Sequence, residues 1–337
     1  MTSRIAFWRQ TSPNTGLSDA RTVDLSTRVG SVELPNPIMT ASGTAGHGAE
    51  LDAYVSLRTL GAHVVKSLSA EPWAGNPAPR VHEASAGMLN SVGLQGPGVD
   101  AWLADDLPAL QACGARTVAS IWGRTVDEFK RAAAALAGSA VVAVEVNLSC
   151  PNLDGGKHLA GSGALAPQGM FAQSSTDTAA AIEAVVAVLD RPVWAKLTAQ
   201  VANLADIAAA ARDAGADAVT LTNTMLGMAI DPDTRQYRLG SGAGGGGLSG
   251  PAIHPIAVRA VHDVHVALPD LPIVGVGGVA SGADAVELLL AGAAAVQVGT
   301  ATFADPRATA RVLTGLEHWC VGHGVTHARD IIGGAHD

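Results

Sequence analysis

Three observations along the chain predict an α/β fold. Eight apolar runs of strand length recur over the 337 residues, and Ala-rich helical patterns separate them. The runs are nearly continuous Val, Ile, Ala and Leu rather than alternating, as expected for parallel strands buried on both faces. Eight strand-then-helix units indicate a (β/α)8 TIM barrel with long loops at its C-terminal face. A doubly wound open sheet is the competing arrangement.

Each predicted strand is an apolar run that ends in small or polar residues. The strands are predicted at 37–42, 63–67, 116–121, 141–148, 192–197, 218–223, 272–276 and 295–299. The helical patterns between them fall near 50–60, 99–112, 125–137, 176–189, 203–214, 253–267, 282–291 and 305–322.

One large barrel accounts for most of the length, and no linker indicates a second domain. Residues 1–35 are polar and carry turn signals, so they are predicted to be an N-terminal extension that packs across one end of the barrel. The barrel is predicted over 36–322, and residues 323–337 are predicted to be a C-terminal tail.

Long insertions follow strands two, four and six, at 69–98, 153–175 and 228–250. They are therefore expected on the C-terminal face, where long loops usually act as lids or binding loops. The third insertion contains Gly244–Gly247, which are predicted to form a loop. No GxGxxG motif follows a strand, so a dinucleotide-binding fold is not supported.

Composition excludes several classes of partner. The net charge is −9 with no run of Lys or Arg, which argues against nucleic acid and anionic membrane surfaces. No stretch of about 18 uncharged apolar residues occurs, so no membrane-spanning helix is expected. Cys113, Cys150 and Cys320 lie far apart without metal-ligand spacing, so neither a disulfide framework nor a metal site is predicted, and a reducing cytoplasm is the expected location.

Polar and small residues follow six of the eight predicted strands, and the carboxyl ends of barrel strands share one rim. Only four lysines occur, and two of them, Lys66 and Lys196, end apolar strands, where a surface role fits poorly. Glycines after strands seven and eight predict a phosphate cradle of backbone N–H groups. A phosphate, two cations and several amides on one rim favour flavin mononucleotide (FMN), since a lysine can stabilise the charge that a flavin gains on reduction.

The end of strand four reads Asn147-Leu148-Ser149-Cys150-Pro151-Asn152. A thiol with an ordinary pKa of about 8.5 can serve as the base that removes a carbon-bound proton. Taken singly, each feature has a plainer explanation: a lone Cys is usually a small buried residue, a lysine a salt-bridged surface group, a glycine a turn, and an Asn a helix cap. Their convergence on one rim favours a catalytic site.

These motifs resemble the dihydroorotate dehydrogenases of class 1, and most closely the class 1B catalytic subunit. The resemblance covers about residues 23–315. It is carried by the strand-four motif 147–152, by Ala86-Gly-Met-Leu-Asn-Ser-Val-Gly-Leu-Gln95, and by segments 222–232, 246–255 and 297–306.

The resemblance implies an FMN-dependent flavoprotein oxidoreductase that oxidises (S)-dihydroorotate to orotate in pyrimidine (UMP) biosynthesis. Cys150 would take the C5 proton while hydride passes from C6 to flavin N5. The residues implied in substrate binding are Lys66, Asn90, Ser91, Val92, Gly93, Leu94, Asn147, Asn152, Asn223 and Thr224. Those implied in cofactor binding are Ser42, Gly43, Lys66, Ser67, Asn147, Lys196, Thr222, Gly250, Gly277, Gly278, Gly299 and Thr300.

The resemblance also implies a homodimer and a second subunit with FAD and an iron–sulfur cluster that passes electrons to NAD. Two alternatives remain open. A dihydropyrimidine-type dehydrogenase acting on a related ring is disfavoured by Asn152, where those relatives typically have His. The other alternative is a flavin-binding partner protein that has lost turnover.

Overall fold

The computed structural model describes residues 23–150, 170–240 and 245–336. Over these residues, eight parallel strands form one sheet in the order β3-β14-β13-β10-β9-β8-β7-β4. A parallel bridge between Met39 of β3 and Ala62, the residue before β4, joins the two edges of this sheet, so the sheet closes into a barrel and the open-sheet alternative is wrong. The strands are β3 (Ile38–Thr40), β4 (His63–Val64), β7 (Thr117–Ile121), β8 (Ala143–Asn147), β9 (Val193–Lys196), β10 (Ala218–Leu221), β13 (Ile273–Val276) and β14 (Ala295–Val298).

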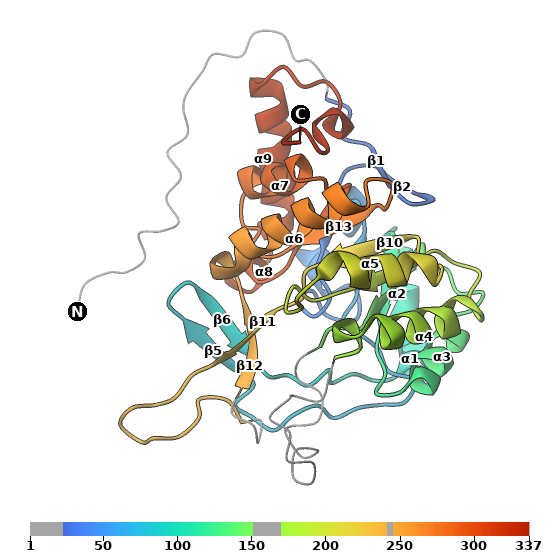
Figure 1. Cartoon of the computed structure of the whole chain (residues 1–337), viewed down its shortest axis with the longest axis vertical. Helices are drawn as coiled ribbons and strands as arrows, with labels where there is room; N and C mark the ends of the chain where they lie inside the picture. Colours follow the sequence, from blue (N-terminus) through green and yellow to red (C-terminus); the bar gives the residue numbers. More distant parts are fainter. Residues whose placement is uncertain (1–22, 151–169, 241–244, 337) are drawn as a thin grey trace.

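Helices surround the barrel (Figure 1). Polar caps fix where several of them begin: the Thr125 side chain accepts a hydrogen bond from the Glu128 amide, and Ser281 forms a capping box with Asp284. The helices are α1 (Val99–Asp105), α2 (Leu107–Ala112), α3 (Val126–Ala135), α4 (Ser175–Val186), α5 (Leu204–Asp213), α6 (His254–Ala267), α7 (Gly282–Leu290), α8 (Ala301–Ala304) and α9 (Ala308–Gly322). Among the helices of the described residues, none has the length and apolarity needed to cross a lipid bilayer.

The helix predicted near 50–60 is replaced by two short 3-10 helices, η2 (Glu50–Ala53) and η3 (Leu57–Thr59). The Asp52 carboxylate accepts a hydrogen bond from the Leu57 amide at 2.8 Å. A short polar side chain that bonds to nearby backbone competes with helical hydrogen bonding, so the segment turns instead of continuing.

A hairpin closes the N-terminal end of the barrel. Strands β1 (Thr27–Val29) and β2 (Val32–Leu34) pair antiparallel. Val29 and Leu34 are buried in an apolar cluster with Trp194 inside the barrel. Ligands therefore have to enter from the opposite, carboxyl end.

The insertions after the second and sixth barrel strands meet in a small antiparallel sheet of order β11-β12-β6-β5 (Figure 1). The predicted loop over the Gly-rich run is wrong for its described part, because Gly245–Ser249 is strand β12. A side chain at Gly247 would collide with Thr224, and one at Gly246 with the Asn90 backbone, so glycine permits this close pairing. The other three strands are β5 (Val81–Ala84), β6 (Gly87–Asn90) and β11 (Met225–Met228).

Candidate active site

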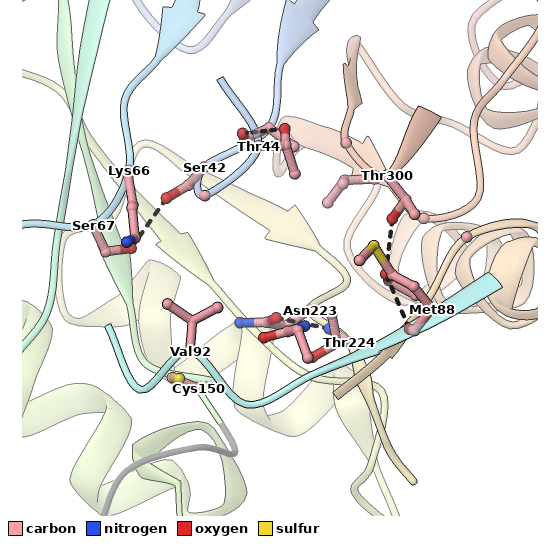
Figure 2. Close-up of a pocket in the computed structure, with 18 of the residues that line it drawn as sticks. Ser42, Thr44, Lys66, Ser67, Met88, Val92, Cys150, Asn223, Thr224 and Thr300 are labelled. Carbon is pink, nitrogen blue, oxygen red and sulfur yellow. Dashed lines mark hydrogen bonds between the residues drawn. The ribbon is translucent and has the colours of Figure 1, made fainter. Parts of the chain in front are cut away.

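A cavity lies at the carboxyl end of the barrel, and seven of the eight described barrel strands contribute to it (Figure 2). The small sheet supplies part of its wall through β5, β6 and β12. The lining residues are Ala41, Ser42, Gly43, Thr44, Lys66, Ser67, Val81, Met88, Asn90, Val92, Gly93, Leu94, Asn147, Cys150, Lys196, Thr222, Asn223, Thr224, Ser249, Gly250, Ile253, Val276, Gly277, Gly278, Gly299, Thr300 and Phe303.

All twelve residues expected to bind a cofactor line this one cavity, and Cys150 lines it too. Eight of the ten residues expected to bind substrate are also present. Ser91 is not among the lining residues: it is buried, and its hydroxyl accepts a hydrogen bond from the Asn76 amide at 3.0 Å. Asn152 lies outside the described residues, as does most of the 153–175 insertion.

Several lining residues were not expected from the sequence. Met88, Val81, Ile253 and Phe303 give part of the wall an apolar character. The site was predicted from polar and small residues that follow strands, and none of these four fits that pattern. The run 86–95 contained a usable signal for Met88, because residues 90–94 of the same run were already expected to bind substrate.

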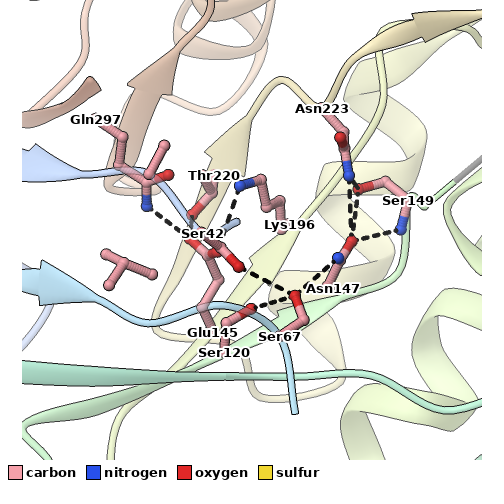
Figure 3. A network of polar contacts seen from close by, with 12 residues as sticks. Ser42, Ser67, Ser120, Glu145, Asn147, Ser149, Lys196, Thr220, Asn223 and Gln297 are labelled. Carbon is pink, nitrogen blue, oxygen red and sulfur yellow. Dashed lines mark hydrogen bonds and ion pairs between the residues drawn. The ribbon is translucent and has the colours of Figure 1, made fainter. Parts of the chain in front are cut away.

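Polar side chains at the rim are joined into a network (Figure 3). Asn147 Nδ2 donates to Ser67 Oγ at 3.1 Å. Ser67 Oγ also lies 3.1 Å from Ser42 Oγ and 2.9 Å from Ser120 Oγ. In each of these two pairs, either hydroxyl can be the donor. Because β8, the end of β7 and two loop segments all take part, the network fixes the relative position of four strand ends.

The amide of Asn147 has its orientation set by its partners. Its Oδ1 accepts hydrogen bonds from Asn223 Nδ2 at 3.2 Å and from the Ser149 hydroxyl at 3.3 Å. Asn223 Oδ1 in turn accepts from the Thr224 backbone amide at 2.7 Å. These contacts align two amides along the cavity wall, where they can bind a ring that carries both N–H and C=O groups.

Lys196 is a buried cation in the cavity wall, with 5% of its surface exposed. Its Nζ lies 3.5 Å from Oε1 of Glu145, which is completely buried and lies on β8. The second carboxylate oxygen of Glu145 accepts hydrogen bonds from Thr220 at 3.0 Å and from Gln297 at 2.7 Å. The cavity therefore has a positive group backed by a negative one inside the barrel.

Lys66 is the second cation of the wall. Burial, with the nearby Arg80 charge, lowers the pKa of its ammonium group. An anionic ligand beside Lys66 offsets this cost, because an opposite charge at close range favours the protonated amine. The position is thus suited to a carboxylate.

Glycines make a third part of the wall, here called the glycine wall: Gly277 and Gly278 follow β13, and Gly299 follows β14. A Cβ at Gly277 would lie 2.6 Å from Ala257 Cβ, and a Cβ at Gly278 would lie 2.6 Å from His254 Cβ. The His254 ring is hydrogen-bonded to the Gly277 carbonyl oxygen at 2.7 Å and to the Glu287 carboxylate at 3.1 Å. Backbone surfaces of this kind are typical of phosphate sites, so the residues present fit a phosphorylated cofactor such as FMN.

Comparison with known proteins gives a consistent result. The family model described as dihydroorotate dehydrogenase matches residues 24–320. A protein of Geobacter metallireducens named dihydroorotate dehydrogenase B (NAD(+)), catalytic subunit, is 42% identical over 314 residues, covering 92% of this chain and 97% of its own. A protein of the same name from Desulforudis audaxviator is 43% identical over 315 residues, covering 93% and 98%.

Proposed function

The chain belongs to the dihydroorotate dehydrogenase family, flavin-dependent oxidoreductases that convert dihydroorotate to orotate in pyrimidine biosynthesis, and we propose that it does so with FMN as cofactor and Cys150 as base. The observation that carries this proposal is the convergence on one cavity of Cys150 with two lysines, two aligned amides and a glycine wall.

The residues divide by the part of the reaction that they serve. The glycine wall and Thr300 would hold the FMN phosphate, and Lys196 would face negative charge on the reduced ring system. When bound, FMN supplies the acceptor for a hydride. Met88 and Ile253 provide apolar surface against which a flat ring system can pack.

The substrate would be held by the remaining polar groups. Lys66 would pair with its carboxylate, and Asn147 and Asn223 would bind its ring amides. As a thiolate, Cys150 would accept the C5 proton while the hydrogen on C6 leaves with its bonding electrons as hydride. The electron pair of the broken C5–H bond then forms the C5=C6 double bond of orotate. In the view of Figure 2, Cys150 and Val92 lie toward one side of the cavity, and Met88 and Thr300 lie toward the opposite side.

The direct test is anaerobic addition of dihydroorotate to the purified yellow protein. Bleaching of the flavin spectrum with stoichiometric orotate production is expected. Bleaching by dihydrouracil but not by dihydroorotate would favour a dihydropyrimidine-type dehydrogenase. Stoichiometric FMN that no dihydropyrimidine reduces would favour a flavin-binding protein without turnover.

The electron acceptor is a separate proposal. Relatives 42–43% identical over more than nine-tenths of their length are named catalytic subunits of an NAD(+)-dependent enzyme. A second subunit with FAD and an iron–sulfur cluster would accordingly pass electrons from this chain to NAD. Affinity purification from the native source, followed by the absorbance spectrum of the complex, tests for that subunit. Light scattering of the purified chain tests for a homodimer.

A further inference from the structure

Glu145 is a buried carboxylate that the proposed reaction does not use. It is completely inaccessible to solvent, and it is not among the residues that line the cavity. An ionised carboxylate buried in a barrel is costly unless its charge is paired and its oxygens are hydrogen-bonded. Its surroundings therefore indicate what it is for.

The two carboxylate oxygens have different environments (Figure 3). Oε2 accepts hydrogen bonds from Thr220 and Gln297, which fix the carboxylate in place. Oε1 accepts no hydrogen bond from any residue in the described part of the chain, and Lys196 Nζ lies 3.5 Å from it. The anchoring contacts are thus on one oxygen, and the other oxygen is directed at the lysine.

Lys196 connects this buried charge to the cavity. It lies on β9, its backbone is paired in register with Asn147 of β8, and its side chain lines the cavity. The Nζ–Oε1 contact is an ion pair rather than a hydrogen bond, so the ammonium hydrogens are not committed to Glu145.

We propose that Glu145 is a positioning residue that holds the Lys196 ammonium at the cavity wall and, through its own negative charge, sets how readily a bound flavin is reduced. This inference rests on the proposed function, because it requires FMN in the cavity. It concerns the magnitude of the cation's effect, and not the identity of the substrate.

The physical reason is electrostatic. A cation beside the flavin favours the electron-rich reduced form, and in a water-poor site the interaction is only weakly screened. A carboxylate 3.5 Å behind the ammonium opposes that effect. With Glu145 ionised, the flavin is next to an ion pair instead of an isolated positive charge. The reduction potential of the flavin is therefore lower than it would be with Lys196 alone.

The test is the midpoint potential of the FMN-loaded protein, measured by reductive titration against a reference dye. Glu145→Gln removes the charge at nearly constant volume. We expect the reduced-to-oxidised ratio at a fixed potential to rise about tenfold, which is about 30 mV for a two-electron couple. An unchanged or lowered potential overturns the inference.

Two further variants separate charge from structure. Thr220→Val removes a hydrogen bond to the same carboxylate and keeps the charge, so its potential should match wild type; a shift as large as that of Glu145→Gln overturns the inference. Glu145→Asp keeps the charge but draws it away from Lys196, and a smaller rise is expected. If Glu145→Gln does not fold, Glu145→Asp decides, and an unchanged potential there overturns the inference.

Failure of the proposed function is recognised separately. A wild-type chain that binds no FMN overturns the proposed function and this inference together. A chain that binds FMN but is not bleached by dihydroorotate overturns the proposed reaction alone, because the dye titration still measures the potential of each variant.

Discussion

The imidazole Nδ1 of His254 lies 2.7 Å from the carbonyl oxygen of Gly277, which ties the first turn of α6 to the glycine segment that ends β13. The other ring nitrogen meets the Glu287 carboxylate of α7 at 3.1 Å. The His254 side chain, which Glu287 itself fixes, therefore supports the backbone of the glycine wall.

Replacing His254 should weaken FMN binding without abolishing it. His254→Ala removes the contact to Gly277, and a single hydrogen bond is worth about 0.5–1.5 kcal/mol, or roughly twofold to tenfold in the dissociation constant. Quenching of flavin fluorescence on binding measures the dissociation constant of FMN. His262→Ala is the control: it lies on the same helix, but its ring stacks on that of His336 and it does not line the cavity, so it should bind as wild type does. Equal weakening in both variants would contradict the assignment.

A methyl group at Gly278 should be more harmful than one at Gly324. Both glycines have φ of +69°, so Ala pays the same left-handed backbone cost of about 1–2 kcal/mol at each. At Gly324 a Cβ meets nothing within 4 Å, whereas at Gly278 it would lie 2.6 Å from His254 Cβ. We expect both variants to lose thermal stability and only Gly278→Ala to lose FMN affinity. Normal FMN binding by Gly278→Ala would exclude this part of the wall as the phosphate site.

Cys150→Ser should slow flavin bleaching by dihydroorotate by about 10²–10⁴-fold at neutral pH, the usual contribution of a general base. An unassisted hydroxyl is a far weaker acid than a thiol, so little of it is ionised at neutral pH, and the residual rate should increase with pH. Stopped-flow absorbance measures the rate. Cys113→Ser is the control, since Cys113 follows α2 and does not line the cavity. A full reductive rate in Cys150→Ser would remove Cys150 from the mechanism.

Acid should destabilise the fold partly through His63. Burial lowers the pKa of its imidazole from 6.5 to about 4. Above pH 6.5 the ring is neutral in both the folded and the unfolded state. Between about pH 6.5 and pH 4 only the unfolded chain takes up the proton, so up to about 3 kcal/mol of stability is lost as the pH falls through this window.

His63→Gln should remove that part of the pH dependence. Urea unfolding midpoints of the two proteins, compared from about pH 7 down to pH 4.5, measure it. His318→Gln, at an exposed position of α9, should keep the wild-type slope. An identical slope in His63→Gln and wild type would show that His63 does not titrate with unfolding.

The barrel strands could be predicted because each is an apolar run with a distinct polar end, such as Val65-Lys66-Ser67. The rim residues followed, since barrel geometry brings those ends together. The small sheet could not be predicted in the same way. Strand β12 is rich in glycine, which lowers strand propensity, and it forms only because β11 and β6 lie close enough on either side to pair with it.

The role of Glu145 could not be predicted from the sequence either. It stands in an apolar strand only two residues before Asn147, yet its partners Thr220 and Gln297 lie 75 and 152 residues further along the chain. Nothing in the local sequence distinguishes a buried, paired carboxylate from a surface one. Only the closed barrel, which brings three strands to one interior point, does so.

The β1–β2 hairpin that seals the amino end of the barrel makes the molecule one-sided. Everything that exchanges with solution has to do so across the face that carries the insertions, while the sealed face bears only on folding. Changes at Val29 or Leu34 should consequently alter yield and stability but leave the catalytic constants of the folded fraction untouched. The hairpin stabilises the barrel at the end away from the cavity, so loops on the cavity face can change in sequence without disturbing it.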